Sequence, residues 1–268
     1  PERQEFLAVM GLADELTEDM ARFVTENEET GRILQDLTGQ NAFVTRLPDS
    51  KNYRFHHMMK ECAIRKFRTL PGASQTAYWN RFGDWYGAHG QYLHALDAYR
   101  MSANNDAALA IIEKDAGNLL SAIAPEDLLS RLDACPAEVL MRHPTALLVL
   151  MRRLFTWRQI PKMLQMKALL TRAIAESPDM TAEERGNLLG ECDLIMSFLS
   201  YNDITEMSRL HRSASRQMTR SAVTIQAGSW TFGSPSVLMM YYRAPGELQK
   251  ELHEMNECMP HYYRITNG

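Results

Sequence analysis

Apolar residues recur at helical spacing along most of the chain. In the first 40 residues they predict three short helices, of which the first ends near Gly11 and the third ends at Gly39. Thr17 is a suitable cap for the second helix, and Asn27 is our predicted cap for the third. Each helix carries one apolar stripe, as expected of helices that pack around a small common core.

Two short β-type segments follow these helices. Residues 43–47 and 53–55 are rich in aromatic and β-branched side chains, and Pro48 begins the polar turn between them. Three helices followed by a two-stranded wing are typical of a winged helix. The sequence therefore predicts a winged-helix module over residues 1–70.

A winged helix often binds DNA, but the charges here favour a protein-interaction module. A helix that contacts the DNA groove should carry Arg, Lys, Asn or Gln. The third predicted helix mixes Arg32 and Gln35 with Asp36, and the second carries Glu18 and Asp19. Acidic side chains there oppose contact with phosphate.

The stretch from Tyr53 to Phe67 leads from the wing directly into an amphipathic helix. We expect it to connect the winged helix to the helices that follow, with Tyr53, His56 and His57 holding that contact. The adjacent histidines point about 100° apart on a helix, so they are poor joint ligands for one metal ion. We therefore expect them to pack or cap rather than to bind metal.

The next segment carries a helix-pair motif. Residues 79–86 fit the spacing W-x2-L-G-x2-Y with Phe82 in place of Leu, and Ala95 and Tyr99 continue it. This is the tetratricopeptide signature, in which small residues such as Gly83 lie where the paired helices touch. A single pair cannot bury its own apolar face, so further pairs should follow.

These stretches together resemble one family. The run Tyr53–Met59, the Trp79 motif and the run Gly90–Tyr99 are similar to the middle of MalT-like, LuxR-type bacterial transcription regulators of the STAND class. The resemblance covers Phe6 to about Leu120, and beyond that point mainly the architecture agrees.

The resemblance implies a nucleotide-binding ATPase module in cis before the winged helix and a DNA-binding helix-turn-helix at the end of the regulator. This chain has no GxxxxGK[ST] motif, so ATP is expected only in a missing upstream module and no cofactor is expected here. It starts at Pro1 without Met, and we expect it to be a fragment. A small-molecule or protein inducer and a ligand-dependent oligomer are also implied.

Helix patterns continue through residues 71–268 and recur at about 40 residues, as in a helical solenoid. Thr181 and Glu184 form a capping-box pattern, and Asp203 and Glu206 form a similar one. The predicted fold is mainly α, with the winged helix followed by a right-handed tetratricopeptide-like superhelix that acts as a sensor array.

One predicted helix in this array, over residues 205–220, carries a basic stripe. Four arginines lie within about 80° of one another around it: Arg209, Arg212, Arg216 and Arg220. One interpretation is a solvated face, or pairing with acids on a neighbouring helix. The other is an anion-binding wall for an inducer, to which we assign Arg209, Arg212 and Arg216.

A Gly- and aromatic-rich segment at 228–235 interrupts the helical pattern. Its aromatic side chains either fill a gap between helix pairs or join a ligand surface with residues farther along. The candidate ligand residues from this region are Trp230, Phe232, Tyr241, Tyr242 and Arg243.

Composition narrows the remaining classes. The chain has 268 residues, 45% of them hydrophobic, and a net charge of −4, so no global field favours nucleic acid or an anionic membrane. Its four cysteines are widely spaced, without CxxC, as in a reduced cytoplasmic protein. No apolar run is long enough to cross a membrane, and we expect no membrane contact. Cys258 and His261 offer only two metal ligands, which is too few for a site.

Two functions follow from these patterns. The first is the central sensor and relay region of a transcription regulator, in which an inducer binds the superhelix and changes the winged helix. The alternative is a tetratricopeptide-type scaffold that binds partner proteins or peptides without a small-molecule ligand. We expect no enzymatic activity, because GxSxG, HExxH and comparable catalytic motifs are absent.

Overall fold

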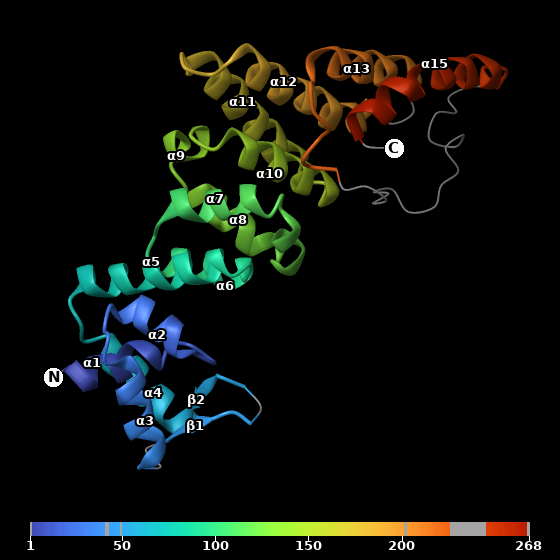
Figure 1. Cartoon of the computed structure of the whole chain (residues 1–268). Coiled ribbons are helices and arrows are strands. Elements are labelled where there is room, and N and C mark those ends of the chain that lie inside the picture. Colours follow the sequence, from blue (N-terminus) through green and yellow to red (C-terminus); the bar gives the residue numbers. More distant parts are fainter. Residues whose placement is uncertain (1, 41–42, 49, 201–202, 226–244, 267–268) are drawn as a thin grey trace. The chain divides into compact units, whose positions relative to one another are not determined.

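The computed structural model describes residues 2–40, 43–48, 50–200, 203–225 and 245–266. Most of these residues are in helices (Figure 1). The chain divides into two compact units, Pro1–Ile111 and Ile112–Gly268. The first unit contains both the winged helix and the first helix pair. The predicted boundary at residue 70 falls inside this unit, between the winged helix and the first helix pair. The separate functions assigned to the two sides of that boundary stay a prediction.

The winged helix begins with three helices, as the apolar pattern predicts. They are α1 (Glu2–Met10), α2 (Glu18–Thr25) and α3 (Thr30–Gly39). The Thr17 hydroxyl caps α2 by accepting a hydrogen bond from the Met20 amide at 3.1 Å. The prediction that Asn27 caps α3 is wrong, because Asn27 Oδ1 accepts from the Glu29 amide at 2.8 Å in the turn before that helix.

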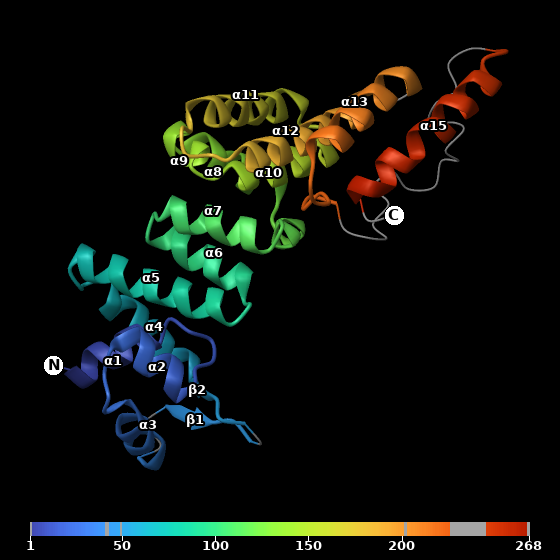
Figure 2. The same ribbon diagram turned by 45° about the horizontal axis from the view of Figure 1, so that its top comes forward.

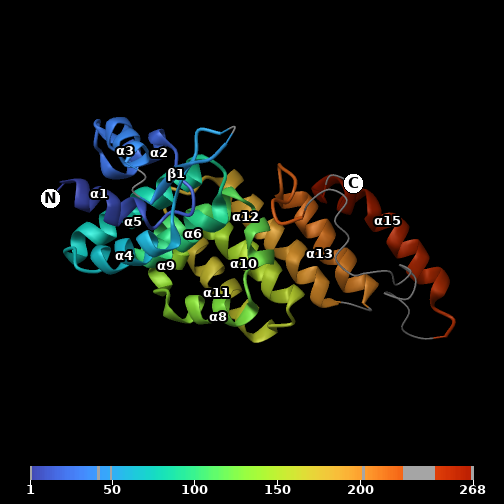
Figure 3. The same ribbon diagram turned by 90° about the horizontal axis from the view of Figure 1, so that it is seen from below.

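The wing is the hairpin of β1 (Val44–Arg46) and β2 (Tyr53–Phe55), which pair antiparallel with Thr45 opposite Arg54. A third segment extends it. The backbone of Leu16, between α1 and α2, exchanges two hydrogen bonds with Tyr53 at 2.8 and 3.0 Å. The loop before α2 is therefore fixed to the wing at one edge. Strand β1 packs against α3, and α3 packs against α2 (Figure 3).

Helix α4 (His57–Phe67) follows β2 directly and packs against α1. Its buried residues Ala63 and Phe67 face the core, while its first residues are exposed. The core itself is formed by apolar side chains from α1, α2, α3, the wing and α4, and its most buried members include Val9, Met10, Leu34 and Phe55. The expected winged-helix architecture is confirmed.

The first helix pair is α5 (Gly72–Ala88) and α6 (Tyr92–Met101), joined by the turn His89-Gly90-Gln91. The two helices approach closely at Gly83. A Cβ at that position would lie 2.5 Å from the Tyr99 ring, so only glycine fits without displacing the ring. The Tyr99 hydroxyl donates to Asp84 at 2.7 Å, and this bond and burial raise the pKa of Tyr99.

Helix α7 (Asn105–Lys114) lies at the division between the units, and the rest of the second unit is almost entirely helical. A 3-10 turn (Asn118–Ala122) leads to α8 (Pro125–Ala134), α9 (Ala137–Met141) and α10 (Pro144–Thr156). Helix α11 (Ile160–Glu176) pairs with α10, and α12 (Ala182–Ser197) follows it. The capping box of Thr181 and Glu184 is present at the start of α12.

The second unit ends with α13 (Ile204–Gln217), which packs on α12, and α15 (Leu248–Thr266), which packs on α13. Helices α13 and α15 run in the same direction, side by side (Figure 2). The contacts between them confirm the parallel direction, because the starts of the two helices pair with each other and so do their ends. The Thr205 hydroxyl donates to Glu254 at 2.8 Å, and Arg264 donates to the Ser215 carbonyl at 2.8 Å. None of the helices that the structure describes has the length and apolar character to span a bilayer.

Candidate functional site

The strongest candidate for a functional contact is the joint between the winged helix and α5. The Phe67 ring at the end of α4 lies 5.8 Å from the Trp79 ring in an edge-on arrangement, and Trp79 lies 5.8 Å from Phe82. Phe82 is 1% exposed and belongs to the same apolar core as the winged helix. The two parts therefore share one core rather than meeting at a polar surface.

Polar contacts close the rim of this joint. The Tyr78 hydroxyl donates to Glu5 of α1 at 2.9 Å, and burial together with Glu5 raises the pKa of Tyr78 to about 12. The Arg81 guanidinium donates to the Val24 carbonyl at 3.2 Å and also pairs with Glu26. Arg81 thus satisfies a carbonyl at the C-terminal end of α2, where cations interact favourably with the helix dipole.

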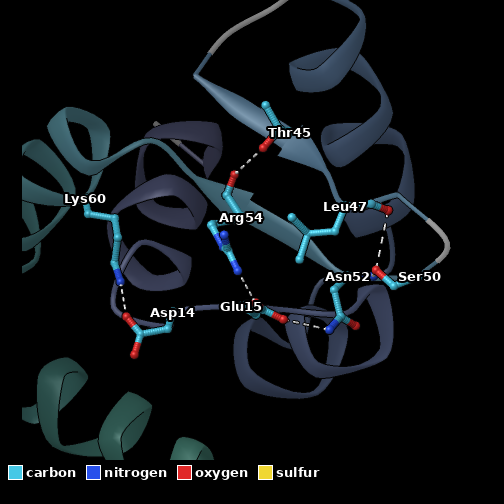
Figure 4. Close-up of polar contacts among 8 residues, drawn as sticks. All are labelled: Asp14, Glu15, Thr45, Leu47, Ser50, Asn52, Arg54 and Lys60. Atoms are coloured by element: carbon cyan, nitrogen blue, oxygen red, sulfur yellow. Dashed lines mark hydrogen bonds and ion pairs between the residues drawn. The ribbon is translucent and has the colours of Figure 1, made fainter.

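A second set of contacts fixes the loop between α1 and α2 to the wing (Figure 4). Asp14 pairs with Lys60 of α4, and Glu15 pairs with Arg54 of β2 and accepts from the Asn52 amide at 2.9 Å. Lys60 lowers the pKa of Asp14, and Arg54 lowers the pKa of Glu15. Both carboxylates are therefore charged near neutral pH.

The predicted relay residues occupy different environments. Tyr53 is buried in the core, and its backbone joins the wing to Leu16. His56 and His57 are exposed, with ring centroids 4.2 Å apart, and His56 Nδ1 caps α4 by accepting from the Met58 amide at 3.4 Å. They line an open cleft of about 540 Å³ beside the wing, together with Phe43, Thr45, Arg54 and other neighbours. Their part in a relay stays a prediction.

Several of the contacts that join the winged helix to α5 come from residues to which the sequence analysis gave no part in this joint. Tyr78 and Arg81 carry the polar contacts, and Phe23 of α2 lies 5.7 Å from Trp85. The available signal was their spacing, since Tyr78, Arg81 and Trp85 recur at i, i+3 and i+7 on α5. That face was predictable, but its partners on α1 and α2 were not.

The structure does not keep the four arginines of the predicted basic stripe on one helix, because α13 ends at Gln217 and Arg220 lies beyond it. Arg220 pairs at 2.9 Å with Glu191 of α12, which is fully buried, and Arg209 pairs with Glu206 on α13. Arg212 and Arg216 have no ion-pair partner within the described part of the chain. The other five candidate ligand residues, Trp230, Phe232, Tyr241, Tyr242 and Arg243, lie outside the described residues.

Three side chains form a buried polar chain across α12, α13 and α15. His211 Nε2 lies 2.9 Å from Ser197 Oγ, and His211 Nδ1 lies 3.4 Å from Cys258 Sγ. The Ser197 hydroxyl donates to the Leu194 carbonyl at 2.6 Å, so its proton is directed away from the imidazole. Burial lowers the pKa of His211 to about 4 and raises the pKa of Cys258. This arrangement fastens three helices and does not activate a nucleophile.

Cys258 therefore contacts His211 and not His261, which instead lies 3.3 Å from Ser215 Oγ. Across the described ranges, no group of three or more His, Cys, Asp or Glu side chains is placed to hold a metal ion.

An open groove of about 740 Å³ lies where α9 and the C-terminal end of α11 meet the start of α12. Met141, Met180 and Leu188 supply apolar surface, and Glu138 and Asp179 are among its acidic residues. Arg172 pairs with Glu176 at 2.7 Å in the same groove. The volume suits a small ligand or a short peptide segment.

Comparison with known proteins supports the N-terminal assignment. Residues 1–75 match the family model described as the MalT winged helix domain. No curated protein and no solved structure matches this chain. The matched range ends within the first turn of α5, so it covers the whole winged helix and stops before the helix-pair motif. The chain thus carries at its N-terminus a winged helix domain similar to that of MalT.

Proposed function

We propose that this chain is the sensor and relay region of a MalT-type, LuxR-family transcription regulator of the STAND class. The observation that supports this most directly is the shared core between a MalT-type winged helix and α5. Because Phe82 lies within that core, the winged helix and α5 have to move together. Such a rigid joint is what a relay between a sensor and a switch module requires.

In this proposal an inducer binds the helical array and changes the position of the winged helix. It does so only if it binds one arrangement more tightly than the other. Within the proposed ligand wall, Arg212 and Arg216 are better placed than Arg209, whose guanidinium makes two 2.7 Å contacts with Glu206. Trp230, Phe232, Tyr241, Tyr242 and Arg243 complete the proposed ligand set.

The remaining roles follow from the same proposal. The winged helix contacts an ATPase module in cis, ATP belongs to that module, and DNA is bound by a helix-turn-helix elsewhere in the regulator. Inducer binding leads to a change in oligomeric state. The protein acts in the cytoplasm, and this region has no catalytic step of its own.

The relay is tested with a variant that weakens the rim of the joint but keeps its core. Arg81→Ala combined with Tyr78→Phe removes the contacts to Val24, Glu26 and Glu5. In the full-length protein we expect the inducer response of a transcription reporter to be lost or to become constitutive. The matched control is Arg65→Ala with Tyr263→Phe, two exposed positions whose side chains make none of the rim contacts. An unchanged inducer response in the rim variant, with the protein folded, refutes the relay.

The ligand wall is tested separately. Arg212→Ala with Arg216→Ala should weaken binding of an anionic inducer by at least about tenfold, since two charge-assisted contacts would be lost. Arg209→Ala should weaken it less, because Glu206 already holds that guanidinium. Equal inducer affinity in the wild type and the double variant, measured by calorimetry, removes the wall from the proposal.

The second candidate function is a scaffold that binds partner peptides, and the groove at α9, α11 and α12 favours it. Its methionines provide the adaptable surface typical of promiscuous peptide sites. Met141→Glu places a charge in that groove. If the chain is a scaffold, this change should abolish capture of partner peptides. In that case neither the wild type nor any variant should show a reporter response to a small-molecule inducer.

A further inference from the structure

A second cleft in the first unit has a lining that suits one kind of ligand. It has a volume of about 440 Å³ and lies between the loop before α2, the wing and the turn that joins α5 to α6. The walls come from both the winged helix and the first helix pair. Its size falls within the range of small-molecule sites.

The lining is rich in hydrogen-bond acceptors. Asp14 Oδ1 is held by Lys60, and Asp14 Oδ2 has no hydrogen-bond partner among the described residues. The Asn52 amide nitrogen donates to Glu15, which directs the Asn52 carbonyl oxygen elsewhere as a further acceptor. No Lys or Arg side chain lines the cleft.

The imidazole of His89 adds an acceptor. His89 Nδ1 lies 2.8 Å from the Trp85 carbonyl, which can only accept, so Nδ1 carries the proton of the neutral ring. The other nitrogen, Nε2, is then an acceptor. The His89 ring also stacks on the Trp85 ring, with centroids 3.9 Å apart, and this holds the imidazole in place.

The cleft also has an aromatic wall. Trp85 and Tyr86 both line it, and flat cations bind favourably over such rings. Asp14 lies near this wall, since burial and the charge of Asp14 together raise the pKa of Tyr86 to about 12. The Asp14 side chain is 88% exposed and pairs with Lys60, so it offers a bound cation a solvent-screened surface charge.

We propose that this cleft binds a guanidinium or primary ammonium group, with Asp14 as its principal anionic partner and Trp85 as its platform. Several acceptors, an aromatic ring and no lining cation match a positively charged donor and disfavour an anion. The group comes either from a free small cation or from an Arg side chain of a partner. This site goes beyond the proposed relay and does not depend on it.

The test uses matched ligands on the whole 268-residue chain. N-acetyl-argininamide is compared with N-acetyl-citrullinamide, which has a neutral ureido group of nearly the same shape. At low ionic strength we expect saturable binding of the arginine compound by calorimetry and binding of the citrulline compound weaker by at least about tenfold. Agmatine is the third probe. Tighter binding of agmatine indicates a free cation, and tighter binding of N-acetyl-argininamide indicates a side chain.

The variants locate the site. Asp14→Asn should weaken the arginine probe by about tenfold, whereas Asp127→Asn, an exposed carboxylate on α8, should leave it unchanged. Trp85→Phe keeps an aromatic ring for packing but reduces the platform, so it should weaken the probe less than Asp14→Asn. Equal affinity for the arginine and citrulline compounds, equal affinity in wild type and Asp14→Asn, or no saturable binding of either cation overturns the proposal.

Discussion

The joint of the first unit and the α12–α13–α15 cluster of the second are held together by different physical means. At the joint, apolar side chains such as Phe82 fill the interior and the ion pairs lie at the rim, where Glu26 is 66% exposed. In the α12–α13–α15 cluster, polar groups lie inside: Glu191 is fully buried, and His211 is 6% exposed. Removing a charged side chain should therefore reduce stability little at the joint and much more in the α12–α13–α15 cluster.

The difference has a functional meaning. Exposed ion pairs contribute little to stability, so the rim contacts of the joint can be lost or exchanged while the apolar core still holds the winged helix to α5. Buried polar groups tolerate no such exchange, because each needs its own partner. In the proposed relay the joint transmits the change, whereas the α12–α13–α15 cluster keeps its shape.

The largest expected effect tests the apolar side of this comparison. Phe82→Ala removes a ring that is 1% exposed in the shared core and should destabilise the first unit by about 3–5 kcal/mol. Urea denaturation followed by circular dichroism measures the loss. Phe82→Leu is the matched control and should cost much less, because it leaves a smaller cavity. A loss for Phe82→Ala below about 1 kcal/mol would mean that the two parts do not share a core.

The next effect tests the buried charge of the α12–α13–α15 cluster. Glu191 accepts from the Thr224 amide at 2.8 Å and pairs with Arg220, which is 37% exposed. Glu191→Ala should cost roughly 2–3 kcal/mol, below the loss of a fully buried pair because Arg220 can still reach water. Glu191→Gln keeps an acceptor for the Thr224 amide and should cost about half as much. Chemical denaturation distinguishes them, and equal stability of all three proteins would contradict the assignment.

A third prediction uses pH. The pKa of His211 is lowered to about 4 in the folded chain, whereas an unfolded histidine titrates near its ordinary value of 6.5. Between these values the unfolded state binds a proton that the folded state does not. The stabilisation is therefore complete above about pH 6.5 and declines as the pH falls towards 4.

From about pH 7.5 to about pH 5 the wild type should lose roughly 2 kcal/mol more than His211→Asn, which has no titrating ring at this position. Denaturation at both pH values gives the comparison. Parallel losses in the two proteins would show that His211 is not the group responsible. His253→Asn, an exposed histidine on α15, should behave like the wild type.

The smallest effect tests the rim of the joint. Arg81→Ala breaks the pair with Glu26 and the bond to the Val24 carbonyl, and it should cost about 1 kcal/mol or less. Raising the salt concentration should reduce even that difference, since the pair is partly exposed. A cost of about 3 kcal/mol would place Arg81 with the buried polar groups and remove the contrast between the two regions.

Local features were predictable because their causes lie close together in the sequence. Thr17 caps α2 and Thr181 with Glu184 forms a capping box, each through contacts within three residues. Residues 53–55 form the return strand of a hairpin whose turn is marked in the sequence. Gly83 lies where the helix-pair motif places a small residue. Together with the apolar periodicity, these signals determined the mainly helical fold and the winged helix.

Partners across long sequence separations were decided only by the tertiary structure. The sequence grouped Arg220 with Arg212 and Arg216 on one helix face, but α13 ends at Gln217, and Arg220 beyond it pairs with the buried carboxylate of Glu191. It also paired Cys258 with His211 instead of His261. A single helix fixes which direction a side chain points, whereas its partner depends on how other helices are packed around it. The sequence by itself thus determined most of the elements and the caps at Thr17 and Thr181, and the fold determined which charged side chains pair with one another.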